Sequence, residues 1–333
     1  MVNYGPLPRW RATLCSYAPR PIFTESKTTR SGGAPFPRRN SGKIPATSLG
    51  KDDSLLVLSH YKGLLCHNPA PKEAFYKWDR FRTKKEESAM RSVPESKDKP
   101  LFTPGPLTTS RTVKQAMLKD LGSRDFAFIQ VIQEIRDGLL ALAGATNGEY
   151  VAVPMQGSGT FAVEAVLTST IPRDGKVLIV INGAYGHRMV KLCKTAGVAC
   201  AALEFPEDAC PQVGCVAEAL DADPSITHVA VVHCETTTGI VNPIRELGLM
   251  VHEKGRLFFV DAMSSFGAVP VNVTECRIDY IVSSSNKCVE GVPGFAYAIA
   301  RKEPFMKTKG LARSMSLDLY AQWEGLESNG QFR

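Results

Sequence analysis

The sequence has no long hydrophobic run and no cysteine framework. No window of the 333 residues approaches the ~18 to 20 uninterrupted apolar residues that a membrane-spanning helix needs. Its nine cysteines include no C-x-x-C pair, and several lie within apolar stretches such as "MVKLCKTAGVACAAL". An odd number of scattered cysteines is typical of reduced, mostly buried thiols. These absences favour a soluble intracellular protein without a membrane partner.

The sequence also lacks a basic domain for nucleic acid and a cluster of metal ligands. The formal net charge is +7, but residues 1–100 hold 19 Lys and Arg against nine Asp and Glu, which leaves 21 and 24 for residues 101–333. The second segment is therefore slightly acidic, whereas nucleic acid binding needs a basic surface on the folded domain. The triplet "HCE" at 233–235 resembles a metal site, but no second cluster has ligand spacing. We expect neither nucleic acid nor a metal.

Residues 1–100 differ in character from the rest of the chain. Residues 1–50 carry eight Lys or Arg against one acid, Glu25, with many Ser, Thr and Pro. This composition is typical of an organellar transit segment, although seven prolines disfavour the amphipathic helix of a mitochondrial signal. A disordered tail and a wrongly assigned translation start are the alternatives. Residues 68–100 are charged and without periodicity, which predicts a linker. The expected compartment is cytoplasmic or mitochondrial.

From residue 101 to residue 333, apolar runs alternate with helical patterns. The stretch "FIQVIQEIRDGLLALAGA" places four apolar residues on one helix face: Ile129, Ile132, Ile135 and Leu139. The strand-like runs "KVLIVI", "HVAVVH", "RLFFVDA" and "DYIVSSS" follow, separated by helical segments that close with glycine. This alternation predicts an α/β fold with a mostly parallel sheet covered by helices on both faces. Such sheets bind ligands at the carboxyl ends of their strands.

A glycine-rich turn precedes the helical run in "QGSGTFAVEAVLTST". Ser158, Gly159 and Thr160 lie where a helix begins, and the free amides of a helix start can bind an anion such as phosphate. A glycine turn capped by Ser158 or Thr160 explains the stretch equally well.

Two charged residues follow neighbouring apolar runs. Asp261 ends "RLFFVDA", where an ionised carboxylate needs a cation or several donors; a helix cap or a salt bridge is the simpler explanation. Lys287 follows "IVSSSN", and an amine held among small residues loses solvation, which favours the neutral form that condenses with carbonyl groups. An amine, an acid and an anion site are what pyridoxal 5'-phosphate requires. The sequence therefore predicts this cofactor.

These stretches also carry a resemblance to a known family. Residues 101–333 resemble the class V aminotransferases of fold-type I in the following motifs: "TPGPLTTSRTVKQAM", "QGSGTFAVEAVL", "NGAYGHRMV", "HCETTTGIVNPI", "VDAMSSFGA", "SSSNKCVEGVPGFA" and "RSMSLDLYAQW". Residues 1–100 have no counterpart in the resemblance. It implies that residues 101–333 form the large, pyridoxal phosphate-binding domain of a protein that works as a homodimer.

The resemblance implies a role for each matching residue. Lys287 matches the lysine that holds the cofactor covalently and then moves the substrate proton, and Asp261 matches the acid that bonds the pyridine nitrogen. The turn at 158–160 matches the phosphate loop.

Three further residues match positions around the cofactor ring. Tyr185 matches the aromatic residue that stacks on the ring, a role that suits its flat face. Thr236 matches the residue that bonds the phenolic oxygen, and Asn286 is the polar neighbour of the lysine.

The motifs are most similar to members that transfer the amino group of 2-aminoethylphosphonate to pyruvate, giving phosphonoacetaldehyde and alanine. Alanine:glyoxylate or serine:pyruvate transfer is the alternative within the same class. Relatives continue beyond "QFR" into a small C-terminal domain that supplies the arginine for the substrate carboxylate. We therefore keep a third alternative, a truncated and inactive product that binds at most cofactor or partner subunits.

Overall fold

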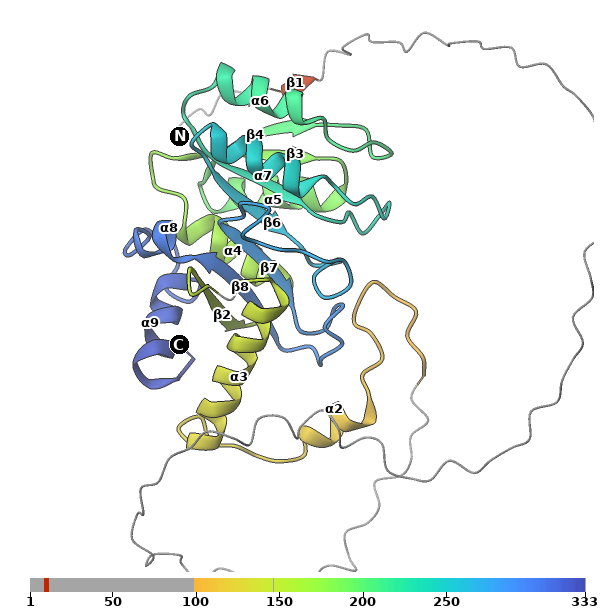
Figure 1. Cartoon of the computed structure of the whole chain (residues 1–333), viewed down its shortest axis with the longest axis vertical. Helices are drawn as coiled ribbons and strands as arrows, with labels where there is room; N and C mark the ends of the chain where they lie inside the picture. Colours follow the sequence, from red (N-terminus) through yellow and green to blue (C-terminus); the bar gives the residue numbers. More distant parts are fainter. Residues whose placement is uncertain (1–8, 12–98, 146, 333) are drawn as a thin grey trace, which may run out of the picture. The chain divides into compact units, whose positions relative to one another are not determined.

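The computed structural model describes residues 9–11, 99–145 and 147–332 (Figure 1). These described residues all belong to one compact unit. Apart from residues 9–11 and 99–100, the expected transit segment and linker lie outside the described residues, so these assignments and the domain boundary near residue 100 stay predictions. Among the helices of the described residues, none is long and apolar enough to cross a membrane.

Within the described residues, eight strands form one sheet in the order β1-β4-β3-β5-β6-β7-β8-β2. The strands are β1 Arg9–Arg11, β2 Tyr150–Gln156, β3 Lys176–Ile181, β4 Ala199–Glu204, β5 Ile226–Val232, β6 Leu257–Asp261, β7 Tyr280–Ser284 and β8 Phe295–Arg301. Only β8 is antiparallel to its neighbours, β7 and β2. The predicted mostly parallel sheet is thus confirmed. The exception arises because the chain reverses after β7 through a turn instead of crossing over through a helix.

Helices cover both faces of this sheet, as predicted (Figure 1). The helices of the described residues are α2 Arg111–Ala116, α3 Phe126–Leu142, α4 Gly159–Ser169, α5 Ala184–Thr195, α6 Val213–Ala222, α7 Ile244–Glu253, α8 Lys302–Met306 and α9 Leu319–Asn329. Of these, α2 buries no residue and lies apart from the sheet (Figure 1). Side chains of α4, α5 and α9 share one hydrophobic cluster, and those of α6 and α7 share another. The helix α3 supplies Ile132 to the first cluster and Leu139 to the second, so two residues of its predicted apolar face are buried, while Ile129 and Ile135 are half-buried.

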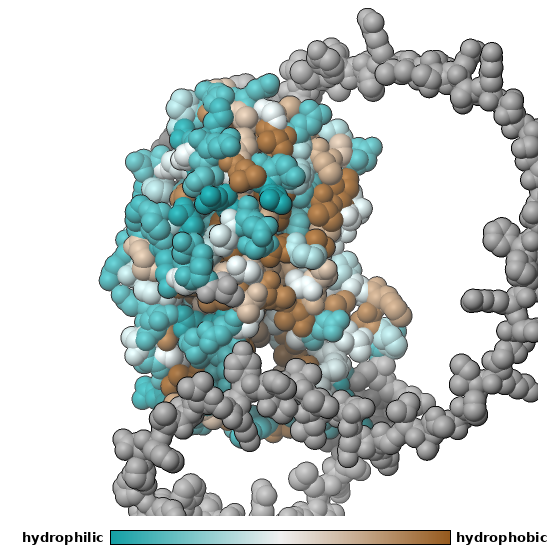
Figure 2. All heavy atoms as spheres, in the orientation of Figure 1, coloured by the Kyte–Doolittle hydropathy of each residue, from teal (hydrophilic) through white to brown (hydrophobic). Residues whose placement is uncertain are grey.

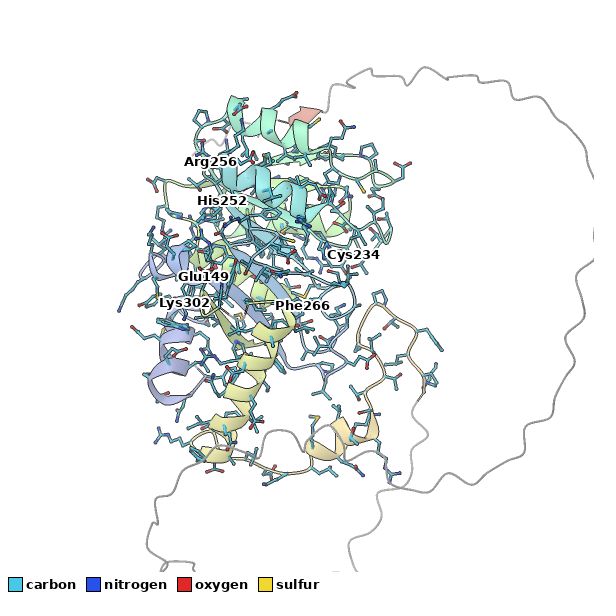
Figure 3. All side chains as sticks on the ribbon, viewed as in Figure 1. Glu149, Cys234, His252, Arg256, Phe266 and Lys302 are labelled. Atoms are coloured by element: carbon cyan, nitrogen blue, oxygen red, sulfur yellow. The ribbon has the colours of Figure 1, made fainter. Side chains whose placement is uncertain are left out.

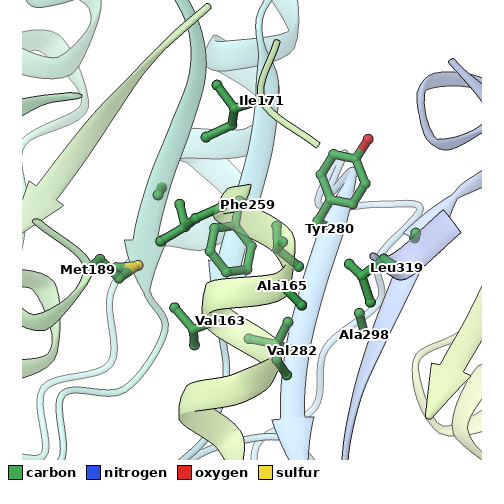
Figure 4. Packing of buried hydrophobic residues seen from close by; sticks show 14 of the residues in the cluster. Val163, Ala165, Ile171, Met189, Phe259, Tyr280, Val282, Ala298 and Leu319 are labelled. Carbon is green, nitrogen blue, oxygen red and sulfur yellow. The ribbon is translucent and has the colours of Figure 1, made fainter. Parts of the chain in front are cut away.

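The core fixes the start of α4 against the ends of the central strands. Val163 of α4 packs in the same cluster as Phe259 of β6 and Val282 of β7 (Figure 4). Alternate residues of each strand point to opposite faces, so Ile179 of β3 lies in this cluster and Leu178 in the other. Because the helix and both strands share one rigid core, the loops at their ends keep a fixed spacing.

Candidate active site

All eight site residues predicted from the sequence lie at one edge of the sheet. Strands β2, β3, β5, β6 and β7 point the same way, so the loops that follow them leave the same edge, where β8 begins. These loops and strand ends carry Ser158, Gly159, Thr160, Tyr185, Thr236, Asp261, Asn286 and Lys287. Figure 3 shows Cys234, after β5, and Lys302, after β8, at opposite edges. Residues from five loops are therefore brought together.

Asp261 is the last residue of β6 and is buried, with 3% of its surface exposed. Its Oδ1 accepts a hydrogen bond from the amide of Met263 at 3.0 Å. Within the described residues no ion pair and no other hydrogen bond reaches this carboxylate, so it is neither part of a salt bridge nor a helix cap. The pKa of Asp261 is raised to about 6, mainly by burial; the charge of Glu235 contributes to the rise, while the Met263 amide and Lys287 are among the groups that oppose it.

Lys287 lies in a tight turn between β7 and β8. Its carbonyl accepts a bond from the amide of Glu290 at 2.8 Å, and Glu290 adopts a left-handed φ of 61°. The lysine is half-buried, and a Cβ atom on Gly105 would lie 2.4 Å from its Cδ and 3.0 Å from its Nζ. The adjacent Asn286 accepts a bond from the hydroxyl of Ser284 at 3.1 Å. The amine is thus held at the edge of the sheet by a short, internally bonded loop.

The start of α4 offers hydrogen-bond donors that are not used within the helix. Ser158 is the residue that precedes the helix, but its side chain makes no capping bond, contrary to the simpler explanation of this stretch. The first amides of a helix have no acceptor within it, and among the described residues no hydrogen bond from the amide of Gly159 or Thr160 is found. A Cβ atom on Gly159 would lie 2.3 Å from the sulfur of Met263, so a glycine allows the helix start to approach the loop after Asp261.

Ser264 joins three of the converging loops. Its hydroxyl lies 2.5 Å from that of Thr236 in the loop after β5. Its carbonyl accepts a bond from the thiol of Cys288, beside Lys287, at 3.5 Å. The loops after β5, β6 and β7 are therefore tied to one another around a residue that the sequence did not single out.

Tyr185 lies in the first turn of α5 and is half-buried. The guanidinium carbon of Arg188 lies 4.5 Å from the centre of its ring, a cation–π contact that occupies one face. The amide of Tyr185 donates to Glu235, a residue the sequence had suggested only as part of a metal-like triplet. That triplet does not converge, because the ring of His233 bonds Ser265 instead, with Nδ1 2.8 Å from Oγ.

A cavity of about 680 Å³ lies outside the cluster of predicted residues. Its walls are the end of α3, the start of α7 and the loop 266–276, together with His233. None of the eight predicted residues lines it. The cavity therefore does not mark the site.

Comparisons with known proteins show the family to which the chain is similar. Residues 110–322 match the family model described as aminotransferase class-V. The chain is 53% identical over 233 residues to the 2-aminoethylphosphonate--pyruvate transaminase of Rhizobium meliloti (strain 1021), which covers 70% of this chain and 61% of that protein. The protein of the same name from Lysinibacillus sphaericus (strain C3-41) is 52% identical over 233 residues, covering 70% and 64%. The chain thus spans about three fifths of the length of these curated relatives.

Solved structures show the same fold. Pyridoxamine-pyruvate aminotransferase from Mesorhizobium loti matches with a TM-score of 0.64 at 28% identity, covering 70% of this chain and 60% of that one. Alanine--glyoxylate aminotransferase from Nostoc sp. matches with a TM-score of 0.65 at 25% identity, covering 75% and 67%. The predicted fold-type I architecture is confirmed, and the chain belongs to the class V aminotransferases.

Proposed function

We propose that this chain forms the pyridoxal phosphate-binding part of an aminotransferase that moves the amino group of 2-aminoethylphosphonate to pyruvate. The observation that carries the proposal is the placement of Lys287 and Asp261 at adjacent strand ends, with the unpaired amides of α4 at the same edge. An amine, an acid and an anion site are the groups that this cofactor needs. The choice of donor rests on the names of relatives that are 52–53% identical.

The residues at this edge fit the cofactor. Oδ2 of Asp261 accepts no hydrogen bond from the described residues and suits the N–H of a protonated pyridine ring. Above pH 6 the buried carboxylate is ionised, and its charge favours that protonated form. The amides at the start of α4, with the hydroxyls of Ser158 and Thr160, would hold the phosphate. Thr236 would bond the phenolic oxygen.

Tyr185 would lie against the cofactor ring. Because Arg188 occupies one face of Tyr185, the cofactor ring would stack on the opposite face. The same guanidinium lowers the pKa of Asp261, and so helps to keep the carboxylate ionised.

Lys287 would hold the cofactor and move protons. Once bound, the cofactor draws electrons away from the substrate carbon that carries the amino group. Nζ of Lys287, free once the amino group of the substrate has replaced it on the cofactor, would take the proton from that carbon and pass it to the carbon of the cofactor that bears the transferred nitrogen. Gly105 lies against the lysine side chain and would limit the directions in which Nζ can swing.

We extend the proposal to a homodimer. Large apolar side chains are exposed along the segment before α3 and at its first residue, including Phe102 at 96%, Leu118 at 76% and Phe126 at 80%. Figure 2 shows hydrophobic side chains exposed among the polar ones on the face drawn there. Such exposure is typical of surfaces that another chain covers. Light scattering of the purified protein should give twice the mass of one chain.

The substrate assignment is tested by comparing amino donors. The purified chain, loaded with pyridoxal phosphate, is given 2-aminoethylphosphonate, alanine or serine, with pyruvate or glyoxylate as acceptor. We expect alanine to form fastest from pyruvate with the phosphonate donor. Turnover only with alanine and glyoxylate would favour the second candidate function, which the likeness to the Nostoc enzyme supports. Covalent loading without turnover with any donor would contradict the proposed activity for this chain.

A further inference from the structure

Glu235 is fully buried beneath the start of α5, with 0% of its surface exposed. Its Oε1 accepts a hydrogen bond from the amide of Gly186 at 3.2 Å, and its Oε2 accepts one from the amide of Tyr185 at 3.4 Å. The residue that precedes α5 is Gly183, which has no side chain to cap the helix. A carboxylate from the loop after β5 therefore caps a helix that begins after β3.

The carboxylate of Glu235 occupies the space where a side chain on Gly183 would begin. A Cβ atom on Gly183 would lie 2.5 Å from Cδ and 2.6 Å from Oε2 of Glu235. The backbone φ of Gly183 is 174°, an extended value that any residue adopts. Lack of space, and not backbone conformation, is therefore what requires glycine at this position.

A second contact ties the same two loops together. The side-chain amides of Asn182 and Asn242 exchange two hydrogen bonds of 2.8 and 2.9 Å, and both residues are buried. Asn242 also donates to the carbonyl of Val232, at the end of β5, at 2.8 Å. The loop after β3 and the loop after β5 are thus joined by two buried polar contacts, one of which involves Glu235.

We infer that Glu235 is a positioning residue, which fixes the ring of Tyr185 relative to Thr236 and so sets where the cofactor ring lies. The inference rests on the proposed function, because it takes Tyr185 and Thr236 as cofactor contacts. Thr236 directly follows Glu235 in the chain, and the backbone amide of Tyr185 donates a hydrogen bond to the carboxylate of Glu235. Loss of the carboxylate would free the first turn of α5 and let the Tyr185 ring move away from Thr236.

The charge of Glu235 also reaches Asp261, which provides a second readout. Burial is the main cause of the raised pKa of Asp261 and the charge of Glu235 adds to it, opposed by the Met263 amide, Arg188 and Lys287. The nearby His233 is neutral at pH 7, because burial lowers its pKa to about 4. Removing the charge of Glu235 should therefore lower the pKa of Asp261. Water admitted by looser packing would also lower this pKa, because burial is its main cause, so the shift counts for the inference only together with the mutant cycle below.

The test is a double-mutant cycle on cofactor affinity. Dissociation constants for pyridoxal phosphate are measured for the unchanged chain, Glu235→Gln, Tyr185→Ala and the double variant. We expect Glu235→Gln alone to weaken cofactor binding by about tenfold. In the Tyr185→Ala background the same substitution should weaken binding by less than about twofold, because both substitutions remove the same contact, that of the Tyr185 ring with the cofactor ring. The acidic limit of cofactor binding should also move to lower pH in Glu235→Gln. Additive effects of the two substitutions would overturn the inference.

Hydrogen exchange of the cofactor-free protein gives a readout that needs no loaded enzyme. Amides of the segment 183–187 should exchange faster in Glu235→Gln than in the unchanged chain; unchanged exchange overturns the inference. The control is Asp318→Ala, because Oδ1 of Asp318 caps α9 by accepting a hydrogen bond of 3.0 Å from the amide of Ala321. That variant should lose stability and keep its cofactor affinity.

Two further measurements separate a failure of this inference from a failure of the proposed function. If Glu235→Gln does not fold, Gly183→Ala displaces the carboxylate without removing it, and it should weaken cofactor binding in the same Tyr185-dependent way. If the unchanged chain forms no borohydride-reducible link at Lys287, the proposed function is wrong. Additive effects in a chain that does form this link overturn only the role of Glu235.

Discussion

Gly105 lies directly against the side chain of Lys287, so that a Cβ atom at residue 105 would come within 2.4 Å of Cδ. Gly105 also has a φ of 131°, a conformation that residues with a side chain rarely adopt. Both facts require glycine at this position. The segment before α2, far from Lys287 in the sequence, thereby forms one wall around the lysine.

The first prediction is that Gly105→Ala slows cofactor attachment more than it affects folding. The added methyl group must displace the lysine side chain or its own loop, and neither lies in the core. We expect attachment of pyridoxal phosphate, followed by visible absorbance, to slow by about tenfold or more. The control is Gly148→Ala, where glycine also has a positive φ of 79° but an added Cβ atom meets no atom within 4 Å. Equal attachment rates in both variants would contradict the prediction.

The second prediction is that Lys287→Ala abolishes covalent attachment of the cofactor. The measurement is the mass of the protein after borohydride reduction in the presence of pyridoxal phosphate, together with visible absorbance. Lys302→Ala is the control, because Lys302 is a lysine at the opposite edge of the sheet (Figure 3). A reduced adduct at another lysine in Lys287→Ala would show that the assignment of Lys287 is wrong.

The sequence predicted the fold well where its patterns repeat. The run "KVLIVI" alternates between the two hydrophobic clusters, and "RLFFVDA" extends one residue beyond each end of β6. Parallel strands place their carboxyl ends together, so the convergence of Asp261 and Lys287 followed from strand order alone. Periodicity and topology together therefore located the edge that carries the site.

Contacts between distant segments could not be predicted in this way. Arg136 shows this in the core, since it lies on a helix face beside Ile132 and is buried with only 6% exposed. Its Nε donates to the carbonyl of Ala152 in β2, and its guanidinium pairs with Glu327 in α9. No local pattern indicates a partner 191 residues away. The contact of Gly105 with Lys287 and the capping of α5 by Glu235 could not be predicted from the sequence for the same reason.

The third prediction is that Asp261→Asn stabilises the cofactor-free protein at neutral pH. The folded pKa of about 6 exceeds the ordinary value of 3.8, so the folded state binds more protons than the unfolded state between these values. Stability contributed by this group is therefore present at low pH and lost as pH rises through about 6. We expect Asp261→Asn to raise the free energy of unfolding by about 1–3 kcal/mol at pH 8 and by little at pH 4.

Denaturant titrations across pH check this sign, with Asp223→Asn as the control. The pKa of Asp223 is lowered, mainly by the hydrogen bond from Lys176 at 2.6 Å, so its contribution is present at neutral pH and lost on acidification. Asp223→Asn should therefore be less stable than the unchanged chain at pH 8. Lower stability of Asp261→Asn at pH 8 would mean that a partner compensates the buried charge. In the presence of cofactor the same variant should lose turnover by several orders of magnitude.

The fourth prediction is that shortening Glu235 relieves the effect of Gly183→Ala. Alone, the new methyl group at residue 183 lies 2.5 Å from Cδ of a fully buried carboxylate, and overpacking of this kind costs about 1–3 kcal/mol of unfolding free energy. Glu235→Ala alone loses the helix cap, which costs about 1 kcal/mol. In the double variant the carboxylate that the new methyl group would meet is absent. The free energy of unfolding of the double variant should therefore be no lower than that of Glu235→Ala alone. Denaturant unfolding of the three variants measures this coupling. If the two losses simply add, Gly183→Ala acts on the α5 backbone and not through Glu235.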